Sequence, residues 1–191
     1  MGRLDDRSAR VLEGRPPQAA APPHAGRRGR VPSGPLIEIL QESGLGIHPR
    51  LSALGPDILS PRFDGAEALR RLQLRPDREI GEALLDQEAL AGVGNVFKSE
   101  ALFRRRIHPR RRIRDIRPEE FRALWKELAR LMSAGAKVAG SIVTLPRRLR
   151  KHDETRWVYR RTGRPCFVCG TRIETLRQGG RDSYFCPRCQ R

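Results

Sequence analysis

The sequence has no apolar run long enough to cross a bilayer, which takes about 18 or more residues. No apolar segment follows the basic residues near the N-terminus either. A secretory signal needs such a segment directly after its positive charges. We therefore expect neither a transmembrane helix nor export of the chain.

Lysine is scarce as well, with only four residues, although lysine and arginine together number 39 against 22 acidic residues. The formal net charge of +17 is thus carried almost entirely by arginine. A planar guanidinium donates two parallel hydrogen bonds to a phosphate, which an ammonium group does not. This composition favours a polyanionic partner.

Cysteine is rare too: the four cysteines all lie in the last 26 residues, in two Cys-x2-Cys pairs separated by 16 residues. Two such pairs complete a tetrahedral shell around zinc, and four thiolates leave no open position for catalysis. The alternative is a small disulfide staple or unrelated thiols. We predict one structural zinc ion, with these ligands: Cys166, Cys169, Cys186 and Cys189.

Between the two cysteine pairs the pattern predicts two strands, residues 172–177 and 181–185, joined by a Gln-Gly-Gly turn at residues 178–180. Arg181 follows this turn directly, so we expect it at the tip of a hairpin. From there its side chain would reach a nucleic-acid groove. The alternative is a solvated loop residue.

Residues 1–35 are rich in Arg, Pro, Ala and Gly and lack any apolar period, which predicts disorder. A short apolar run begins at Leu36, and Gly55-Pro56 marks a boundary between segments of the chain. Beyond it, apolar residues recur at helical spacing. The first expected helix follows Pro61, is capped by Asp64 and carries Phe63, Ala66, Leu69 and Leu72. The second runs from Asp77 to Leu90 and the third from Val96 to Phe103. The fourth runs from Pro118 to Ser133, with Gly135 just beyond its end.

A glycine-rich turn, residues 92–95, joins the second and third expected helices. Asn95 is a good N-cap, and Gly92 and Gly94 permit tight backbone geometry. Free N–H groups at a helix N-terminus form a site that a DNA phosphate can occupy. A plain turn between two helices, with an Asn cap, is the alternative.

Basic runs at residues 104–114 and 147–151 are compatible with nucleic-acid contact, or with solvated faces only. Their combination with two helices around a glycine turn and a basic zinc ribbon favours the former.

Residues 91–109 (AGVGNVFKSEALFRRRIHP) resemble the helix–two-turns–helix signature of the formamidopyrimidine-DNA glycosylase and endonuclease VIII family. Residues 158–191 resemble that family's C-terminal zinc finger, and residues 54–59 (LGPDIL) match the segment that opens its helical domain. The similarity covers residues 36–191 and is nearest to the bacterial endonuclease VIII-like branch.

This resemblance implies a mainly α fold with a small β zinc ribbon: a helix–two-turns–helix domain over residues 54–150, then a four-cysteine zinc finger over residues 151–191. Members of the family flip a damaged base out of the duplex, cut its glycosidic bond and nick the strand by β- or β,δ-elimination. The resemblance assigns Asn95, with the turn glycines Gly92 and Gly94, to the phosphates around the flipped nucleotide. It assigns Arg181 to a phosphate at the lesion.

The family's chemistry, by the same resemblance, belongs to an N-terminal β-sandwich domain whose terminal proline, next to a glutamate, forms a Schiff base with the sugar. Here Gly2 and Arg3 follow Met1, and no Pro-Glu pair does. Residues 36–53 resemble only the tail of that sandwich and the linker after it. We therefore interpret residues 1–35 as disordered or non-native, from a frameshift, a misplaced start or a truncated gene, and expect no catalytic residue.

The expected function is damaged-DNA binding in base excision repair, as the C-terminal part of a DNA glycosylase/AP lyase of the endonuclease VIII type. Cutting would require the complete protein or a separately encoded N-terminal catalytic fragment. The alternatives are a non-catalytic DNA-binding module and a zinc ribbon that contacts protein. We expect a monomer on double-stranded damaged DNA, in the bacterial cytoplasm at the nucleoid, and no membrane contact.

Overall fold

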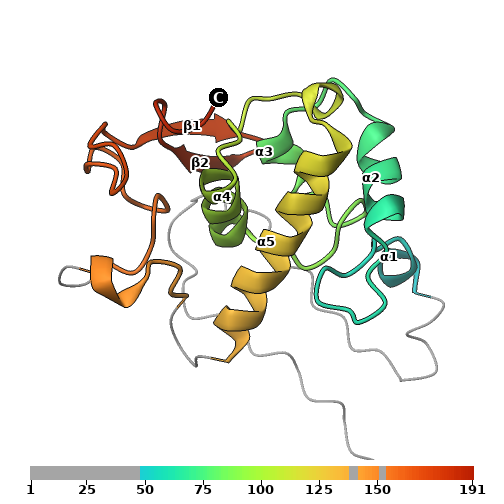
Figure 1. The fold of residues 1–191 in the computed structure, drawn as a ribbon. Helices are drawn as coiled ribbons and strands as arrows, with labels where there is room; N and C mark the ends of the chain where they lie inside the picture. The colour runs from blue at the N-terminus through green and yellow to red at the C-terminus, as the bar shows by residue number, and fades with distance from the viewer. Residues whose placement is uncertain (1–47, 138–141, 151–153) are drawn as a thin grey trace, which may run out of the picture. The chain divides into compact units, whose positions relative to one another are not determined.

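The computed structural model describes residues 48–137, 142–150 and 154–191, all in one compact unit of the chain (Figure 1). The predictions for residues 1–35, and for most of 36–53, lie outside these ranges. The described part is mostly helical and ends in one β-hairpin, which confirms the predicted fold class. Its elements are α1 (Pro49–Ser52), α2 (Gly65–Gln73), α3 (Ile80–Ala83), α4 (Asn95–Arg104), η2 (Ile113–Asp115), α5 (Pro118–Ala136), η3 (Arg147–Leu149), β1 (Glu174–Gln178) and β2 (Arg181–Phe185).

Helix α2 begins as the sequence predicts. The Asp64 carboxylate accepts hydrogen bonds from the backbone N–H groups of Ala66 and Glu67, at 3.0 Å each, and so caps the helix. Its buried face consists of Ala68 and Leu72, whereas Ala66, expected on that face, is exposed.

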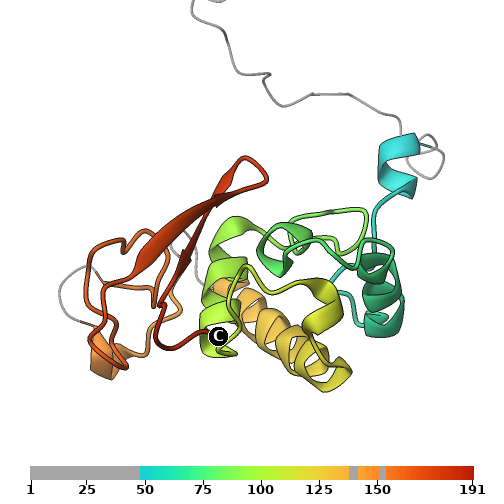
Figure 2. The same ribbon diagram turned by 90° about the horizontal axis from the view of Figure 1, so that it is seen from above.

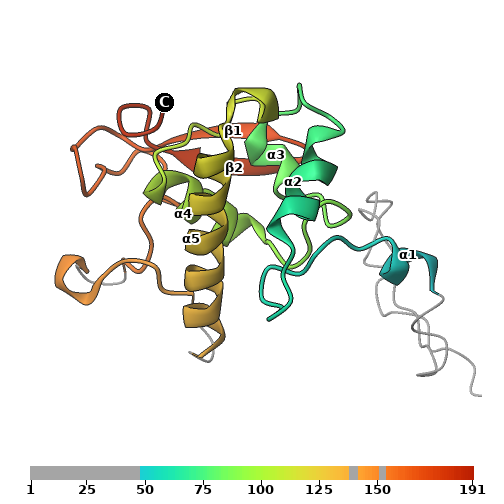
Figure 3. The same ribbon diagram turned by 45° about the vertical axis from the view of Figure 1, so that its right-hand side comes forward.

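Helix α5 is the longest helix of the described ranges and lies between α4 and α2 (Figures 1 and 3). Pro118 is its first residue, as expected, but the helix continues through Gly135 instead of ending before it. A Cβ atom at Gly135 would lie 2.9 Å from Cζ of Phe97 on α4. Gly135 therefore serves the close approach of two helices, not helix termination. The buried apolar residues of α5 are Phe121, Leu124, Trp125, Leu128, Leu131 and Met132; Glu127 is buried beside them.

The helix predicted from Asp77 to Leu90 is wrong, because only the single turn α3 forms. Side chains after it replace helical hydrogen bonds: the Asp86 carboxylate accepts from the Glu88 N–H, and the Gln87 amide joins the Gly92 N–H to the Val93 carbonyl. The apolar residues assigned to that helix, Ile80, Ala83, Leu84 and Leu90, are nevertheless buried.

Strands β1 and β2 pair antiparallel through a two-residue turn at Gly179 and Gly180, whose φ angles are 52° and 76°. Two positive φ values match the right-handed twist of a hairpin and favour glycine at both positions. The first strand is shifted from its predicted position: Gln178 pairs with Arg181 inside the ladder, and Arg172 makes only an isolated bridge to Pro165.

Two hydrophobic cores are present in the described part. The larger joins α2, α3, α4 and α5, and the smaller gathers Trp157, Val158 and Ile173 around the cysteines. Phe103, on α4, packs in the smaller core, while Ala101 and Leu102 pack in the larger one. Helix α4 is thus shared by both cores and lies beside the hairpin (Figure 2). None of the described helices is long and apolar enough to cross a membrane.

Candidate nucleic-acid interface and metal centre

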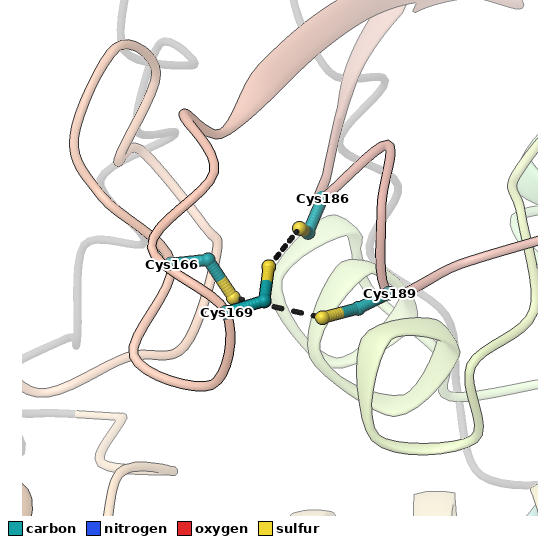
Figure 4. Close-up of side chains that lie close together, drawn as sticks. All are labelled: Cys166, Cys169, Cys186 and Cys189. Carbon is teal, nitrogen blue, oxygen red and sulfur yellow. Dashed lines mark hydrogen bonds between the residues drawn. The ribbon is translucent and has the colours of Figure 1, made fainter.

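The four cysteine sulfurs converge on one point (Figure 4). All four Sγ atoms lie within 4.8 Å of one another, with 3.9 Å between Cys166 and Cys189 and 3.4 Å between Cys169 and Cys186. A tetrahedral zinc site with Zn–S bonds of about 2.3 Å needs sulfur separations of about 3.8 Å. The donor set therefore fits one structural zinc ion, as predicted.

The protonation of these thiols depends on their surroundings. Hydrogen bonds from Thr171 lower the pKa of Cys169 to about 6, whereas burial raises the pKa of Cys186 and Cys189. Zinc binds thiolates, so the ion would hold all four in the charged form and offset the cost of burying them.

A glutamine that follows the last ligand anchors the second cysteine pair to the helical part. Gln190 is buried; its Oε1 accepts from the Cys186 N–H at 2.8 Å, and its Nε2 donates to the Ile107 carbonyl at 2.8 Å. The metal centre is therefore built against the loop that follows α4. Sequence reasoning missed this residue, although an amide directly after a ligand pair was a visible signal.

The N-terminus of α4 differs from the expectation in one respect. Gly94 is the N-cap and Asn95 is the first helical residue, so the predicted Asn cap is wrong, and no side chain caps the helix. The Asn95 amide turns instead to the hairpin, where Nδ2 donates to the Asp182 carbonyl at 2.9 Å. Gly92 has a φ of 90°, a conformation that favours glycine, and a Cβ atom at Gly94 would meet nothing within 4 Å.

The arrangement brings two of the predicted DNA contacts together. Asp182, held by Asn95, directly follows Arg181 at the start of β2. Arg181 is exposed and forms no ion pair with any described residue. Its guanidinium and the uncapped N–H groups of α4 are therefore both available to an anion.

A lysine that the sequence pattern did not single out lies in the same place. Lys98 is fully buried, and its Nζ donates to the Ser183 hydroxyl at 2.8 Å. Burial, with the nearby charge of Arg181, lowers the pKa of Lys98 from 10.5 to about 8. This buried ammonium adds positive charge between α4 and β2.

Glu100 joins α4 to the root of the zinc finger. Its buried carboxylate accepts from three consecutive backbone N–H groups, those of Trp157, Val158 and Tyr159, at 2.8–2.9 Å, and from the Thr144 hydroxyl. The charge of this buried carboxylate is stabilised by N–H and O–H hydrogen-bond donors and not by a cationic side chain.

The tip of the hairpin is held on α3. Gln178 is buried, and its Nε2 donates to the Glu79 carboxylate and, at 3.2 Å, to the Pro109 carbonyl. A Cβ atom at Gly81 would overlap Oε1 of Gln178. The position of the hairpin tip, and so of Arg181, therefore depends on close packing against α3.

The basic run at residues 104–114 is partly neutralised by ion pairs: Arg104 with Glu127, Arg111 with Glu120, and Arg112 and Arg114 with Asp77. In the second run, Arg147, Arg148 and Arg150 are exposed, while Lys151 lies outside the described residues.

Two family models match the chain: the formamidopyrimidine-DNA glycosylase H2TH domain over residues 54–147, and the zinc finger found in FPG and IleRS over residues 163–191. "Endonuclease 8 1" of Mycobacterium tuberculosis (strain H37Rv) is 42% identical in an alignment 150 residues long, which covers 73% of this chain and 54% of that protein. The chain thus spans about half the length of the curated relatives it matches.

Solved structures show the same fold. The MutM (Fpg) protein of Thermus thermophilus is 37% identical, with a TM-score of 0.62 over 74% of this chain and 55% of that one. Lactococcus lactis Fpg, bound non-covalently to DNA that contains an AP site, is 27% identical, with a TM-score of 0.61 over 73% of this chain and 51% of that one. With its H2TH domain and its four-cysteine zinc finger in this order, the chain belongs to the formamidopyrimidine-DNA glycosylase and endonuclease VIII family.

Proposed function

We propose that this chain binds duplex DNA, with a preference for damaged or abasic sites, through the N-terminus of α4 and the hairpin tip. The observation that carries the proposal is the bond between Asn95 and the carbonyl of Asp182, because it joins the uncapped helix end to the residue after Arg181. One phosphate contact from each element fixes the register of a protein on the duplex.

Electrostatics support the proposal. The first N–H groups of α4 carry the positive end of the helix dipole, and Lys98 and Arg181 add two further charges beside them. In the proposed complex Asn95, Gly92 and Gly94 face the phosphates flanking the damaged nucleotide, and Arg181 contacts a phosphate at the lesion. The complex of Lactococcus lactis Fpg with DNA containing an AP site supports this class of ligand.

The biological role that follows is base excision repair, as the C-terminal part of a DNA glycosylase/AP lyase, in the bacterial cytoplasm. Relatives of both the endonuclease 8 and the Fpg type match the chain, so the endonuclease VIII-like branch remains our proposal. The cutting residues belong, in our proposal, to the half of the relatives that this chain does not match. We expect the chain to hold abasic DNA without nicking it.

Binding is tested by fluorescence anisotropy with a duplex that carries a stable abasic analogue and with the same duplex intact. Asn95→Ala and Arg181→Ala should each weaken abasic-duplex binding about tenfold. The first removes the amide that joins the end of α4 to Asp182, and the second removes one phosphate contact. Arg122→Ala is the control, because Arg122 is exposed and pairs with no described acid. Equal binding by all four proteins would contradict the proposed interface.

The salt dependence gives a second readout. If about six phosphates are contacted, log K should fall with log salt at a slope of about −5, and Arg181→Ala should make it shallower by about one. Nicking is measured in parallel on a natural abasic site. Strand cleavage at a rate typical of complete relatives, or a covalent adduct trapped by borohydride, would refute the non-cutting role. Cleavage that appears only after adding the N-terminal half of a relative would support a separately supplied catalytic fragment.

A further inference from the structure

A second basic surface lies at the other end of α4, and it begins with an unusual backbone conformation. The helix ends at Arg104, and Arg106 has a φ of 58°. The Ile107 N–H returns to the Leu102 carbonyl at 3.0 Å, which closes the helix in the manner that favours glycine at the position of Arg106. An arginine held there against backbone preference suggests a use for its side chain.

Arg106 lines a pocket of about 180 Å³ next to the zinc knuckle, with Val168 and the ligand Cys189. The pocket has a buried aromatic floor, because Phe103 and Trp157 are only 5% and 8% exposed. Val168 forms an apolar rim and is 58% exposed. The full lining is Phe103, Arg104, Arg106, Trp157, Val168 and Cys189.

Of the two arginines that line this pocket, Arg104 is paired with Glu127, whereas Arg106 is unpaired within the described residues, and further unpaired arginines neighbour the lining residues in sequence or through the backbone. The Arg191 N–H donates to the Arg106 carbonyl, and the His108 N–H donates to the Arg191 carbonyl, so the end of the zinc finger lies along this loop. Arg105, Arg106, Arg188 and Arg191 are all exposed, and none of them forms an ion pair with a described acidic residue.

This surface is distinct from the proposed lesion contact. Helix α4 has 10 residues, so its two ends are about 15 Å apart, with Asn95 at one end and Arg104 at the other. A phosphate bound at the N-terminus of the helix therefore does not occupy the pocket at its C-terminus.

We propose that this pocket and its arginines bind an acidic segment of another protein that carries one apolar side chain. The arginines supply charge complementarity for carboxylates, and the pocket accepts the apolar side chain beside Val168. Single-stranded nucleic acid fits less well, because base stacking needs an exposed aromatic face and both pocket aromatics are buried.

The test uses the full zinc-loaded chain and a fluorescein-labelled decapeptide of Asp, Glu and Gly with one central Leu. A second peptide replaces that Leu with Ser. The parent chain should bind the Leu peptide at least about fivefold more tightly than the Ser peptide.

Arg106→Gly separates binding from folding. Because glycine tolerates this φ, the variant should melt about 2–4 °C higher, yet bind the Leu peptide at least about fivefold more weakly. Val168→Asp should lose the preference for Leu over Ser. Arg62→Gly is the matched control, since Arg62 is exposed and pairs with no described acid.

The proposal is overturned if both peptides bind equally, or if Arg106→Gly keeps the parental affinity. It is also overturned if Arg106→Gly weakens abasic-duplex binding as much as peptide binding, because the surface would then be a nucleic-acid contact. Unchanged duplex binding by Arg106→Gly supports it. The effect of Asn95→Ala on duplex binding tests the proposed DNA interface independently of this peptide test.

Discussion

At the scale of single residues, the polar groups that matter most are those buried between α4 and the zinc finger. Asn95, Lys98 and Glu100 lie on one helix, and each donates to or accepts from a group at residues 144–183. Helical spacing in the sequence predicted the helix but not these partners, since partners 44–87 residues away leave no trace in a local pattern. The metal site was predictable because Cys-x2-Cys spacing lets both thiolates of a pair reach one ion.

Glu100→Gln should lower the free energy of unfolding by about 2–4 kcal/mol. The amide presents one N–H pair to backbone groups that are themselves donors, so at least one buried donor loses its acceptor. Urea denaturation of the zinc-loaded chain measures the change. Glu119→Gln, on the exposed first turn of α5, is the control and should stay within about 0.5 kcal/mol of the parent.

Lys98 should make stability depend on pH above neutrality. Its folded-state pKa of about 8 lies below its ordinary value of 10.5, so the unfolded chain binds more protons between these values. The cost of burying the charge is therefore full below pH 8, and stability rises as the pH increases from about 8 to 10.5. Urea denaturation from about pH 7 to 10 measures this slope.

Lys98→Met should flatten that slope and raise the free energy of unfolding at pH 7 by about 1–3 kcal/mol. Lys126→Met, at an exposed position of α5, is the matched control. Identical pH profiles for the two variants would show that the buried ammonium carries no such cost.

At the scale of elements, α2, α5 and β2 were predictable because each depends on local signals: a cap, a helical period, or a turn with two glycines. The false helix after Asp77 shows the limit of such signals. Its apolar residues are buried as a helical face would bury them, but Asp86 and Gln87 hydrogen-bond to the backbone and redirect the chain. In this segment the apolar spacing identified the buried residues correctly, but it did not predict the backbone conformation.

Gly81→Ala should move the hairpin tip. The added methyl group would overlap Oε1 of Gln178 and lie 3.0 Å from the Pro109 carbonyl oxygen, so we expect a loss of about 1–3 kcal/mol in the free energy of unfolding. Gly94→Ala meets open space and should cost less, about 0.5–1 kcal/mol, because it loses only the preference for glycine over alanine at the N-cap. Denaturation of both variants provides the comparison, and equal stability would mean that the tip is loosely held.

At the scale of the whole described part, two cores share one helix, and each core contains one tryptophan: Trp125 in the helical core and Trp157 in the core around the cysteines. The smaller core contains metal-ligand cysteines and the larger one contains none, so we expect zinc to matter for the smaller core alone. Composition predicted the charge of the chain but not this division, because Phe103 and Leu145 belong to the finger's core although they precede it in the sequence.

Zinc removal should therefore act on one core. With a strong chelator, fluorescence of a Trp125→Phe variant, which reports Trp157, should shift to longer wavelength, while that of Trp157→Phe should change little. Far-UV circular dichroism should keep most of its helical signal. A shift of both reporters together would show that the two cores unfold as one unit.

The shared helix has a consequence for synthesis on the ribosome. Helix α4 leaves the exit tunnel long before residues 157–159 and 183, so the nascent chain carries the Glu100 carboxylate and the Lys98 ammonium for a time without their hydrogen-bonding partners. We therefore expect α4 to complete its buried hydrogen bonds only after residues 157–159 and 183 have been synthesised.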